Sequence, residues 1–265
     1  MMFGMKRRVK FGIDALDEML GGGLIKGRVY ILSGDTGAGK TLLVFRYLME
    51  GLINEEDCLY IAVDKFPSSI LNYIMLNFGW NMSDLHVMDA VPSHRLYTTA
   101  PSVHDITAKG AIVSASQIDE KSVERGELTV ESIIIKISRQ LQNVKYSRIV
   151  MDSLTTFKKF GAGDEKEKQA VQKLFRFLAD TGATSIITVG DPHQMDLRAE
   201  RILASGHIHI HKKQIVEKGI PRTERYIQVL KMRGSSFDPY PHRYLITKYG
   251  VTVEREKMPF EILTS

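Results

Sequence analysis

The 265-residue sequence has little cysteine or tryptophan, and no hydrophobic run long enough to cross a membrane. Cys58 is the single cysteine, which excludes an intrachain disulfide framework and is typical of a protein from a reducing compartment. The longest apolar run, residues 58–63, is far short of the roughly 18 residues that a membrane helix requires. Basic side chains at the amino terminus are followed by no apolar segment, so we expect no secretory signal and a cytoplasmic location.

Acidic residues are only slightly fewer than basic ones, with 31 Asp and Glu against 36 Lys and Arg. The resulting net charge of +5 is too small to identify a nucleic-acid-binding protein by itself. The excess is local, because residues 211–233 contain seven Lys or Arg and two Glu. This segment is either a solvated face or a surface that meets phosphates.

Apolar, strand-like runs alternate with amphipathic stretches through most of the chain. Strands are expected at residues 29–33, 58–63, 85–90, 148–152 and 185–189, and helices at 42–52, 68–78, 129–142 and 166–179. Short strands separated by turns follow at 206–211, 224–232, 243–247 and 250–254. Polar residues 92–128 and 157–168 are expected to form loops. The pattern predicts one α/β domain spanning residues 1–265, with a mostly parallel sheet, helices on both faces and a C-terminal antiparallel β extension.

A glycine-rich octamer between the first strand and the first helix fits G-x-x-x-x-G-K-[ST], the Walker A loop or P-loop. Glycines let consecutive backbone N–H groups point inward and form an anion site at a helix N-terminus. Lys40 is predicted to reach the β- and γ-phosphates, and the Thr41 hydroxyl to ligate Mg²⁺. The predicted nucleotide-binding residues are Gly34, Asp35, Thr36, Gly37, Ala38, Gly39, Lys40, Thr41 and Leu42.

Such a loop requires a second Mg²⁺ ligand, an acid at the end of a neighbouring strand. Asp152 ends the predicted strand 148–152 and is predicted to hold the metal through water. Ser153 is predicted to support that water or the γ-phosphate. The alternative is that Asp152 is an ordinary strand-end acid that caps the next turn.

Several spaced motifs together resemble the KaiC-like ATPases of the RecA superfamily. Residues 12–24 (GIDALDEMLGGGL) resemble the family's lead-in to the P-loop. Residues 78–80 (FGW), 152–155 (DSLT) and 231–234 (KMRG) match further family motifs in the same order. A single domain of this length also resembles archaeal paralogues of the recombinase RadA. The resemblance implies a RecA-like P-loop NTPase core that binds ATP and Mg²⁺ and assembles as a homo-oligomeric ring or filament.

The resemblance also implies catalytic roles for residues outside the P-loop. Lys231 and Arg233 match a pair that reaches the γ-phosphate of a neighbouring subunit. A solvated strand edge is the alternative, and the sequence does not distinguish a contact within one chain from a contact between chains. The family has two glutamates after its second strand, where this sequence has Asp64 and Lys65. Asp64 retains a carboxylate that is able to act as general base, and Lys65 lowers its basicity by favouring the ionised form. We therefore expect slow ATP hydrolysis.

Two loops in RecA-type proteins contact single-stranded DNA, and the matching segments here are residues 157–168 and 190–206. Lys158 and Lys159 lie between two phenylalanines, a composition suited to binding single strands, and Arg198 and Arg201 lie in the second segment. The sequence therefore predicts an ATP-dependent, single-strand-binding accessory to recombination and repair. Two alternatives remain open: a regulatory ATPase that acts through protein partners, and a nucleotide-bound scaffold that rarely hydrolyses ATP.

Overall fold

The computed structural model describes residues 7–63, 67–90, 130–155, 164–190, 198–217 and 219–263. The helices are α1 (Asp14–Met19), α2 (Lys40–Ile53), α3 (Pro67–Phe78), α4 (Val130–Leu141), α6 (Asp164–Asp180), α7 (Arg198–Leu203) and the 3₁₀ helix η3 (Phe260–Leu263). The strands are β1 (Arg8–Val9), β2 (Leu24–Ile25), β3 (Val29–Gly34), β4 (Cys58–Ala62), β5 (His86–Asp89), β6 (Arg148–Asp152), β7 (Thr184–Val189), β8 (Gly206–Glu217), β9 (Ile220–Met232), β10 (His242–Thr247) and β11 (Gly250–Lys257).

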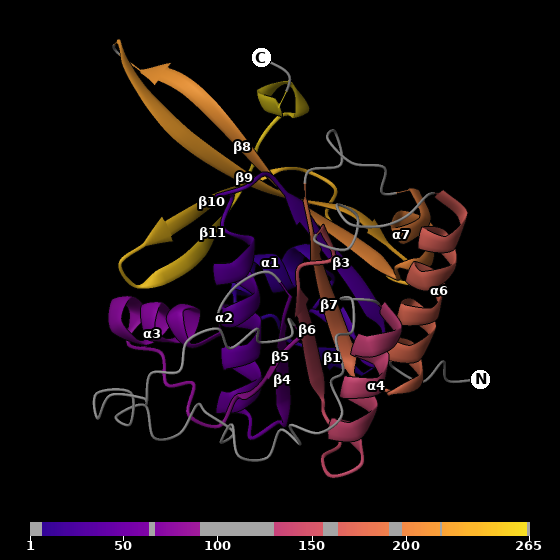
Figure 1. The fold of residues 1–265 in the computed structure, drawn as a ribbon. Helices are drawn as coiled ribbons and strands as arrows, with labels where there is room; N and C mark the ends of the chain where they lie inside the picture. Colours follow the sequence, from indigo (N-terminus) through magenta and orange to yellow (C-terminus); the bar gives the residue numbers. More distant parts are fainter. Residues whose placement is uncertain are drawn as a thin grey trace, which may run out of the picture.

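A nine-stranded sheet forms the centre of the molecule, in the order β11-β10-β9-β8-β3-β7-β6-β4-β5 (Figure 1). Strands β8, β3, β7, β6, β4 and β5 run parallel to their neighbours in this block. Strands β9, β10 and β11 continue the sheet in antiparallel pairing. The predicted fold class is confirmed: a mostly parallel sheet with a C-terminal antiparallel extension.

Each face of the sheet buries a separate hydrophobic cluster. Helices α1, α2 and α3 cover one face and supply residues such as Leu16, Phe45 and Ile74 to the first cluster. Helices α4, α6 and α7 cover the other face, where Ile133 and Leu174 belong to the second cluster. Figure 1 shows these two sets of helices on opposite sides of the strands. Because both faces are covered, the inner strands are buried along their whole length, as in β3, β4, β6 and β7.

The strands of the C-terminal extension are longer than the sequence pattern predicts. β8 pairs with β3 only as far as Ile210, then continues to Glu217 in pairing with β9. Residues 211–217 and 219–225, called the arm below, project from the body as a two-stranded ribbon (Figure 1).

The prediction that residues 157–168 form a loop is wrong from Asp164 onward, because helix α6 begins there. Residues 164–167 are all charged, so the first turn of the helix lacks the apolar periodicity on which the helix prediction depended. The predicted loop at 92–128 lies outside the described residues.

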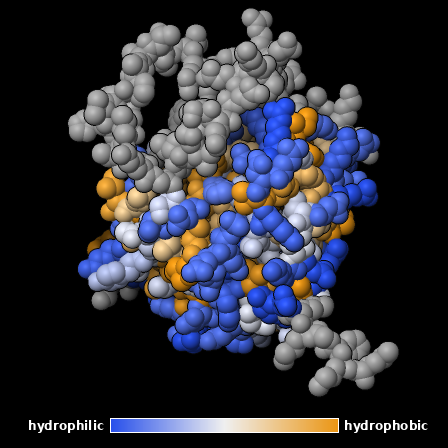
Figure 2. Space-filling view, turned by 90° about the horizontal axis from the view of Figure 1, so that it is seen from below, coloured by the Kyte–Doolittle hydropathy of each residue, from blue (hydrophilic) through white to orange (hydrophobic). Residues whose placement is uncertain are grey.

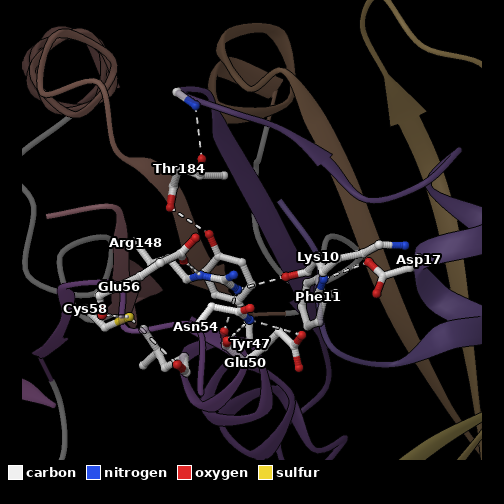
Figure 3. A network of polar contacts seen from close by, with 12 residues as sticks. Lys10, Phe11, Asp17, Tyr47, Glu50, Asn54, Glu56, Cys58, Arg148 and Thr184 are labelled. Atoms are coloured by element: carbon white, nitrogen blue, oxygen red, sulfur yellow. Dashed lines mark hydrogen bonds and ion pairs between the residues drawn. The ribbon is translucent and has the colours of Figure 1, made fainter. Parts of the chain in front are cut away.

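A buried arginine ties the start of β6 to three other parts of the chain (Figure 3). Arg148 is 2% exposed, and its Nη1 donates to the carbonyl oxygens of Lys10 and Tyr47, both at 2.8 Å. Its Nε donates to the Glu56 carboxylate, and its guanidinium lies 4.5 Å from the centroid of the Tyr47 ring. The Tyr47 hydroxyl in turn donates to the carbonyl oxygen of Thr184 at 2.9 Å. The network therefore joins the amino-terminal segment, α2, β6 and β7.

Within the described part of the chain, no helix is both long and apolar enough to cross a membrane. Figure 2 shows the molecule from below, where hydrophilic side chains dominate the coloured surface and hydrophobic ones lie in small groups between them. Apolar atoms contribute more than half of the surface of a typical folded protein, so small groups of this kind are normal.

Replacing Arg148 by methionine is expected to lower the free energy of unfolding by about 2–4 kcal/mol, because it removes the hydrogen bonds above and leaves Glu56 without its ion pair. Urea denaturation of the wild type and the variant measures the loss. Arg46→Met is the control: Arg46 pairs with Glu50 one helical turn away on a partly exposed surface, so the cost there is expected to stay below about 1 kcal/mol. Equal losses for the two variants would contradict the anchoring role of Arg148.

Candidate functional site

The P-loop connects the end of β3 to the start of α2 at the carboxyl edge of the parallel strands. Gly37 and Gly39 have φ angles of +78° and +103°, a region that side-chain-bearing residues rarely adopt. Gly39 is also the N-cap of α2, so the first N–H groups of the helix face the loop. The backbone therefore has the form that an anion site requires.

Lys40 lies over the P-loop itself. Its Nζ donates to the carbonyl oxygens of Gly34 at 2.6 Å and Asp35 at 2.9 Å. The ammonium is therefore held within the loop by two neutral acceptors. A phosphate group offers a charged acceptor in their place, and hydrogen bonds between charged partners are stronger.

Thr41 and Asp152, which are 111 residues apart in sequence, meet at the carboxyl edge of the sheet. The Thr41 hydroxyl donates to Oδ2 of Asp152 at 2.8 Å. Asp152 also accepts hydrogen bonds from Tyr60 at 3.0 Å and from Thr188 at 2.6 Å. Ser153, the next residue, is 5% exposed. Hydroxyl and carboxylate oxygens are the ligands that Mg²⁺ prefers, so this donor set fits the metal.

The antiparallel extension brings further residues to the P-loop that sequence reasoning missed. The Tyr244 hydroxyl donates to the carbonyl oxygen of Gly39 at 3.2 Å, and Ile246 lies beside the same glycine. Nη2 of Arg225 donates to the carbonyl oxygen of Gly37 at 3.3 Å, and the Lys212 ammonium lies close by. Lys212 and Arg225 are cross-strand partners at the base of the arm. The basic run at 211–233 was a signal for them, although it did not say which of its members reach the loop.

Lys231 does not lie at the P-loop of its own chain. Its Nζ donates to carbonyl oxygens at the end of α7, those of Arg201 and of Ala204, the latter at 2.7 Å. Burial, followed by the charges of Arg233 and Arg201, lowers the pKa of Lys231.

Strand register shows how far Lys231 is from the phosphate-binding loop. Lys231 pairs with His207 of β8, and His207 pairs with Ile31 of β3. Gly34 lies three residues further along β3, which is about 10 Å of strand rise. Lys231 also stands two strands away from β3.

A polar chain lies buried beneath the P-loop. The hydroxyl of Ser33 contacts Nε2 of His207 at 2.6 Å and Nδ1 of His209 at 2.7 Å. Burial, with the charges of Arg201 and Lys231, lowers the pKa of His207 to about 4, so this imidazole is neutral near pH 7. The chain packs β3 against β8 at the point where the P-loop begins.

Several predicted residues have no described position. Asp64, Lys158 and Lys159 lie outside the described residues, and only the backbone of Arg198 is described, as the first residue of α7. Arg201 is described and exposed on α7. Their predicted roles are not tested by the geometry.

The fold and the site define a RecA-like P-loop protein. The family model for the KaiC ATPase matches residues 9–258, and the chain belongs to this family. A UPF0273 protein of Pyrococcus furiosus is 29% identical over 258 residues, which are 96% of each chain. The circadian clock protein KaiC2 of Synechocystis is 25% identical over 245 residues, which are 91% of this chain but only 39% of that protein.

The solved structure of a KaiC-like protein from Pyrococcus horikoshii has a TM-score of 0.72. The match covers 94% of this chain and all of that chain, at 23% sequence identity. It shows that the two proteins share a fold.

Replacing Gly39 by alanine is expected to weaken ATP binding at least tenfold, which corresponds to ~1.4 kcal/mol. The new Cβ would lie 2.9 Å from Cδ1 of Ile246 and 3.0 Å from the Tyr244 ring, in a backbone conformation with φ of +103°. Titration with a fluorescent ATP analogue measures the change.

Gly79→Ala is the control for this substitution. Gly79 also has a positive φ, of +64°, but nothing lies within 4 Å of the added Cβ, so only a backbone cost of ~1 kcal/mol in stability is expected. ATP affinity that fell equally in both variants would show that backbone strain, and not the site, is responsible.

Proposed function

We propose that this member of the KaiC family is a Mg²⁺-dependent ATPase that binds ATP at residues 34–42 and hydrolyses it slowly. The observation that carries the proposal is the hydrogen bond between Thr41 and Asp152, because it joins the end of the P-loop to the acid that a metal-assisted phosphoryl transfer requires. Family membership supports ATPase activity in general.

The chain's own residues have distinct roles in the proposed reaction. Backbone N–H groups of the P-loop and the Lys40 ammonium bind the phosphates, and Thr41 and Asp152 hold the metal, the latter through water that Ser153 supports. Bound Mg²⁺ would neutralise charge on the β- and γ-phosphate oxygens. Asp64 accepts the proton of the attacking water, and the adjacent Lys65 reduces its basicity, which makes turnover slow.

Lys231 and Arg233 are proposed to act on the nucleotide of a neighbouring copy of the chain. The sequence alone left open whether they reach the same chain's phosphates. The contact of Lys231 with α7, and its position two strands and about 10 Å from the start of the P-loop, favour the neighbouring copy. This proposal requires a homo-oligomer in which one subunit's β9 faces the next subunit's P-loop.

Two variants test the binding and catalytic roles separately. Lys40→Ala is expected to lose ATP binding, since it removes the ammonium that meets the phosphates. Asp64→Asn is expected to retain ATP binding but to lower turnover by a factor of 10²–10⁴, the usual contribution of a general base. Equilibrium binding and phosphate release measure the two effects. ATP binding that survives Lys40→Ala would contradict the assignment of the P-loop, and unchanged turnover in Asp64→Asn would contradict the base.

Mixing two inactive variants tests the intersubunit contact. Lys40→Ala removes the binding site of one subunit, and Arg233→Ala removes the cation that acts on the next. If Arg233 acts between subunits, mixed oligomers are expected to regain part of the wild-type phosphate release, because some interfaces combine an intact P-loop with an intact Arg233. A mixture that stays as inactive as its components, although native mass shows that the variants co-assemble, would exclude the contact.

The biological role is proposed in two forms. Single-stranded DNA is the partner favoured by the basic residues of segments 157–168 and 190–206 and by the resemblance to RadA paralogues. Of the basic residues predicted to bind DNA, only Arg201 has a described, exposed side chain. A regulatory ATPase or scaffold that works through protein partners is the second candidate, favoured by the similarity to a circadian clock protein.

Salt dependence separates the two roles. Affinity for single-stranded DNA that falls steeply between low and moderate salt supports the first, and no binding at low salt eliminates it.

We further propose a single domain and a cytoplasmic location.

A further inference from the structure

The carboxylate of Asp152 accepts hydrogen bonds from hydroxyls on three different elements. Thr41 of α2 and Tyr60 of β4 both donate to Oδ2, and Thr188 of β7 donates to Oδ1. Asp152 is 2% exposed, and Tyr60 and Thr188 are completely buried. Only Thr41 belongs to the P-loop motif, so two of the three donors have no role in the function proposed above.

The sheet topology brings these two donors to Asp152. β6 lies between β7 and β4, and Asp152 pairs with Ala62 of β4. Tyr60 is two residues before Ala62 and therefore lies on the same face of the sheet, from which its ring reaches forward to Oδ2. On the other side, Thr188 follows Ile187, the partner of Met151. Each strand that flanks β6 thus supplies one hydroxyl.

These hydrogen bonds determine which part of the carboxylate is available to a ligand. An ionised carboxylate has about four acceptor positions, two on each oxygen. Thr41 and Tyr60 take two positions on Oδ2, and Thr188 takes one on Oδ1. Among the contacts of the described residues, the position that remains is therefore on Oδ1. A carboxylate held in this way presents one fixed acceptor to water bound on a metal.

We propose that Tyr60 and Thr188 are positioning residues for Mg²⁺, which orient the Asp152 carboxylate so that its remaining acceptor faces the metal-bound water. The inference rests on the proposed function, because it assumes that Asp152 serves the metal. Hydrogen-bond partners of metal ligands commonly change metal affinity by a factor of 10–100 when they are removed.

The competing explanation is that the two hydroxyls only satisfy buried polar groups. In that case their removal lowers stability but leaves the Mg²⁺ dependence of nucleotide binding unchanged. The test must therefore measure metal dependence directly, apart from turnover.

The experiment titrates Mg²⁺ into protein with a fluorescent ADP analogue and records the midpoint at which binding tightens. Tyr60→Phe and Thr188→Val remove the hydroxyls and keep almost the same side-chain shape. Each is expected to raise the midpoint about tenfold, while affinity for the analogue in EDTA stays as in the wild type. Thr188→Ser keeps the hydroxyl and is expected to stay within about twofold of the wild-type midpoint. If Thr188→Val fails to fold, Tyr60→Phe carries the test.

Matched controls come from the opposite edge of the same sheet. The Tyr47 hydroxyl donates to the carbonyl oxygen of Thr184, and the Thr184 hydroxyl accepts from the backbone N–H of Gly27 at 3.0 Å. Tyr47→Phe and Thr184→Val therefore remove buried hydroxyls of the same kinds, on α2 and β7, far from Asp152. Both are expected to lower the melting temperature without moving the Mg²⁺ midpoint.

Three results would overturn the inference: an unchanged midpoint in Tyr60→Phe and Thr188→Val, the same rise in the controls, or a rise in Thr188→Ser equal to that in Thr188→Val. Failure of the proposed function has a different signature, since the wild type itself would then show no Mg²⁺-dependent binding of the analogue.

Discussion

The meeting of Thr41 and Asp152 is the contact on which the arrangement of the site depends. It is possible only because β3 and β6 run in the same direction, separated by β7, so that the loop after one strand and the last residue of the other reach the same edge of the sheet. Parallel pairing requires a crossover connection between strands, usually a helix, and in this fold the helices cover both faces of the sheet and bury the strands between them. The position of one hydroxyl beside one carboxylate thus follows from the topology of the whole sheet.

The parallel sheet and the P-loop could be predicted from the sequence, because burial and phosphate binding each restrict which residue types occur at which positions. The inner strands are rich in apolar residues, and the P-loop has constrained residues at fixed spacing, so both were located within a few residues. The arm was not located, because its more buried positions include polar residues such as Lys213 and Glu224, so the sequence shows no alternation of apolar and polar residues there. The contacts of Tyr60, Thr188, Tyr244 and Arg225 with the site also left no local signal, since each depends on the register of strands distant in sequence.

Different contacts stabilise the edge of the sheet where the parallel strands begin (the amino edge) and the edge where they end (the carboxyl edge). At the amino edge, Arg148 joins neighbouring segments through carbonyl oxygens and one carboxylate, in a network with no evident chemical role. At the carboxyl edge, the polar groups of Lys40 and Asp152 are held by acceptors and donors of the P-loop and the flanking strands. Substitutions at the amino edge therefore act through stability, and those at the carboxyl edge act on the ligand as well. Protein interiors of this type separate the residues that maintain the scaffold from those that perform chemistry.

Among the strands that the structure describes, none pairs with the outer side of either strand of the arm. Past Ile210, β8 has no described pairing with β3, and the described pairs between β9 and β10 are at Tyr226 and Ile227. Free strand edges of this kind recruit strands from other molecules and so promote aggregation. Lysines, arginines and Pro221 along the ribbon oppose such pairing, because like charges repel an identical edge and proline offers no N–H. The basic composition of this segment thus also protects an exposed ribbon from self-association through its edges.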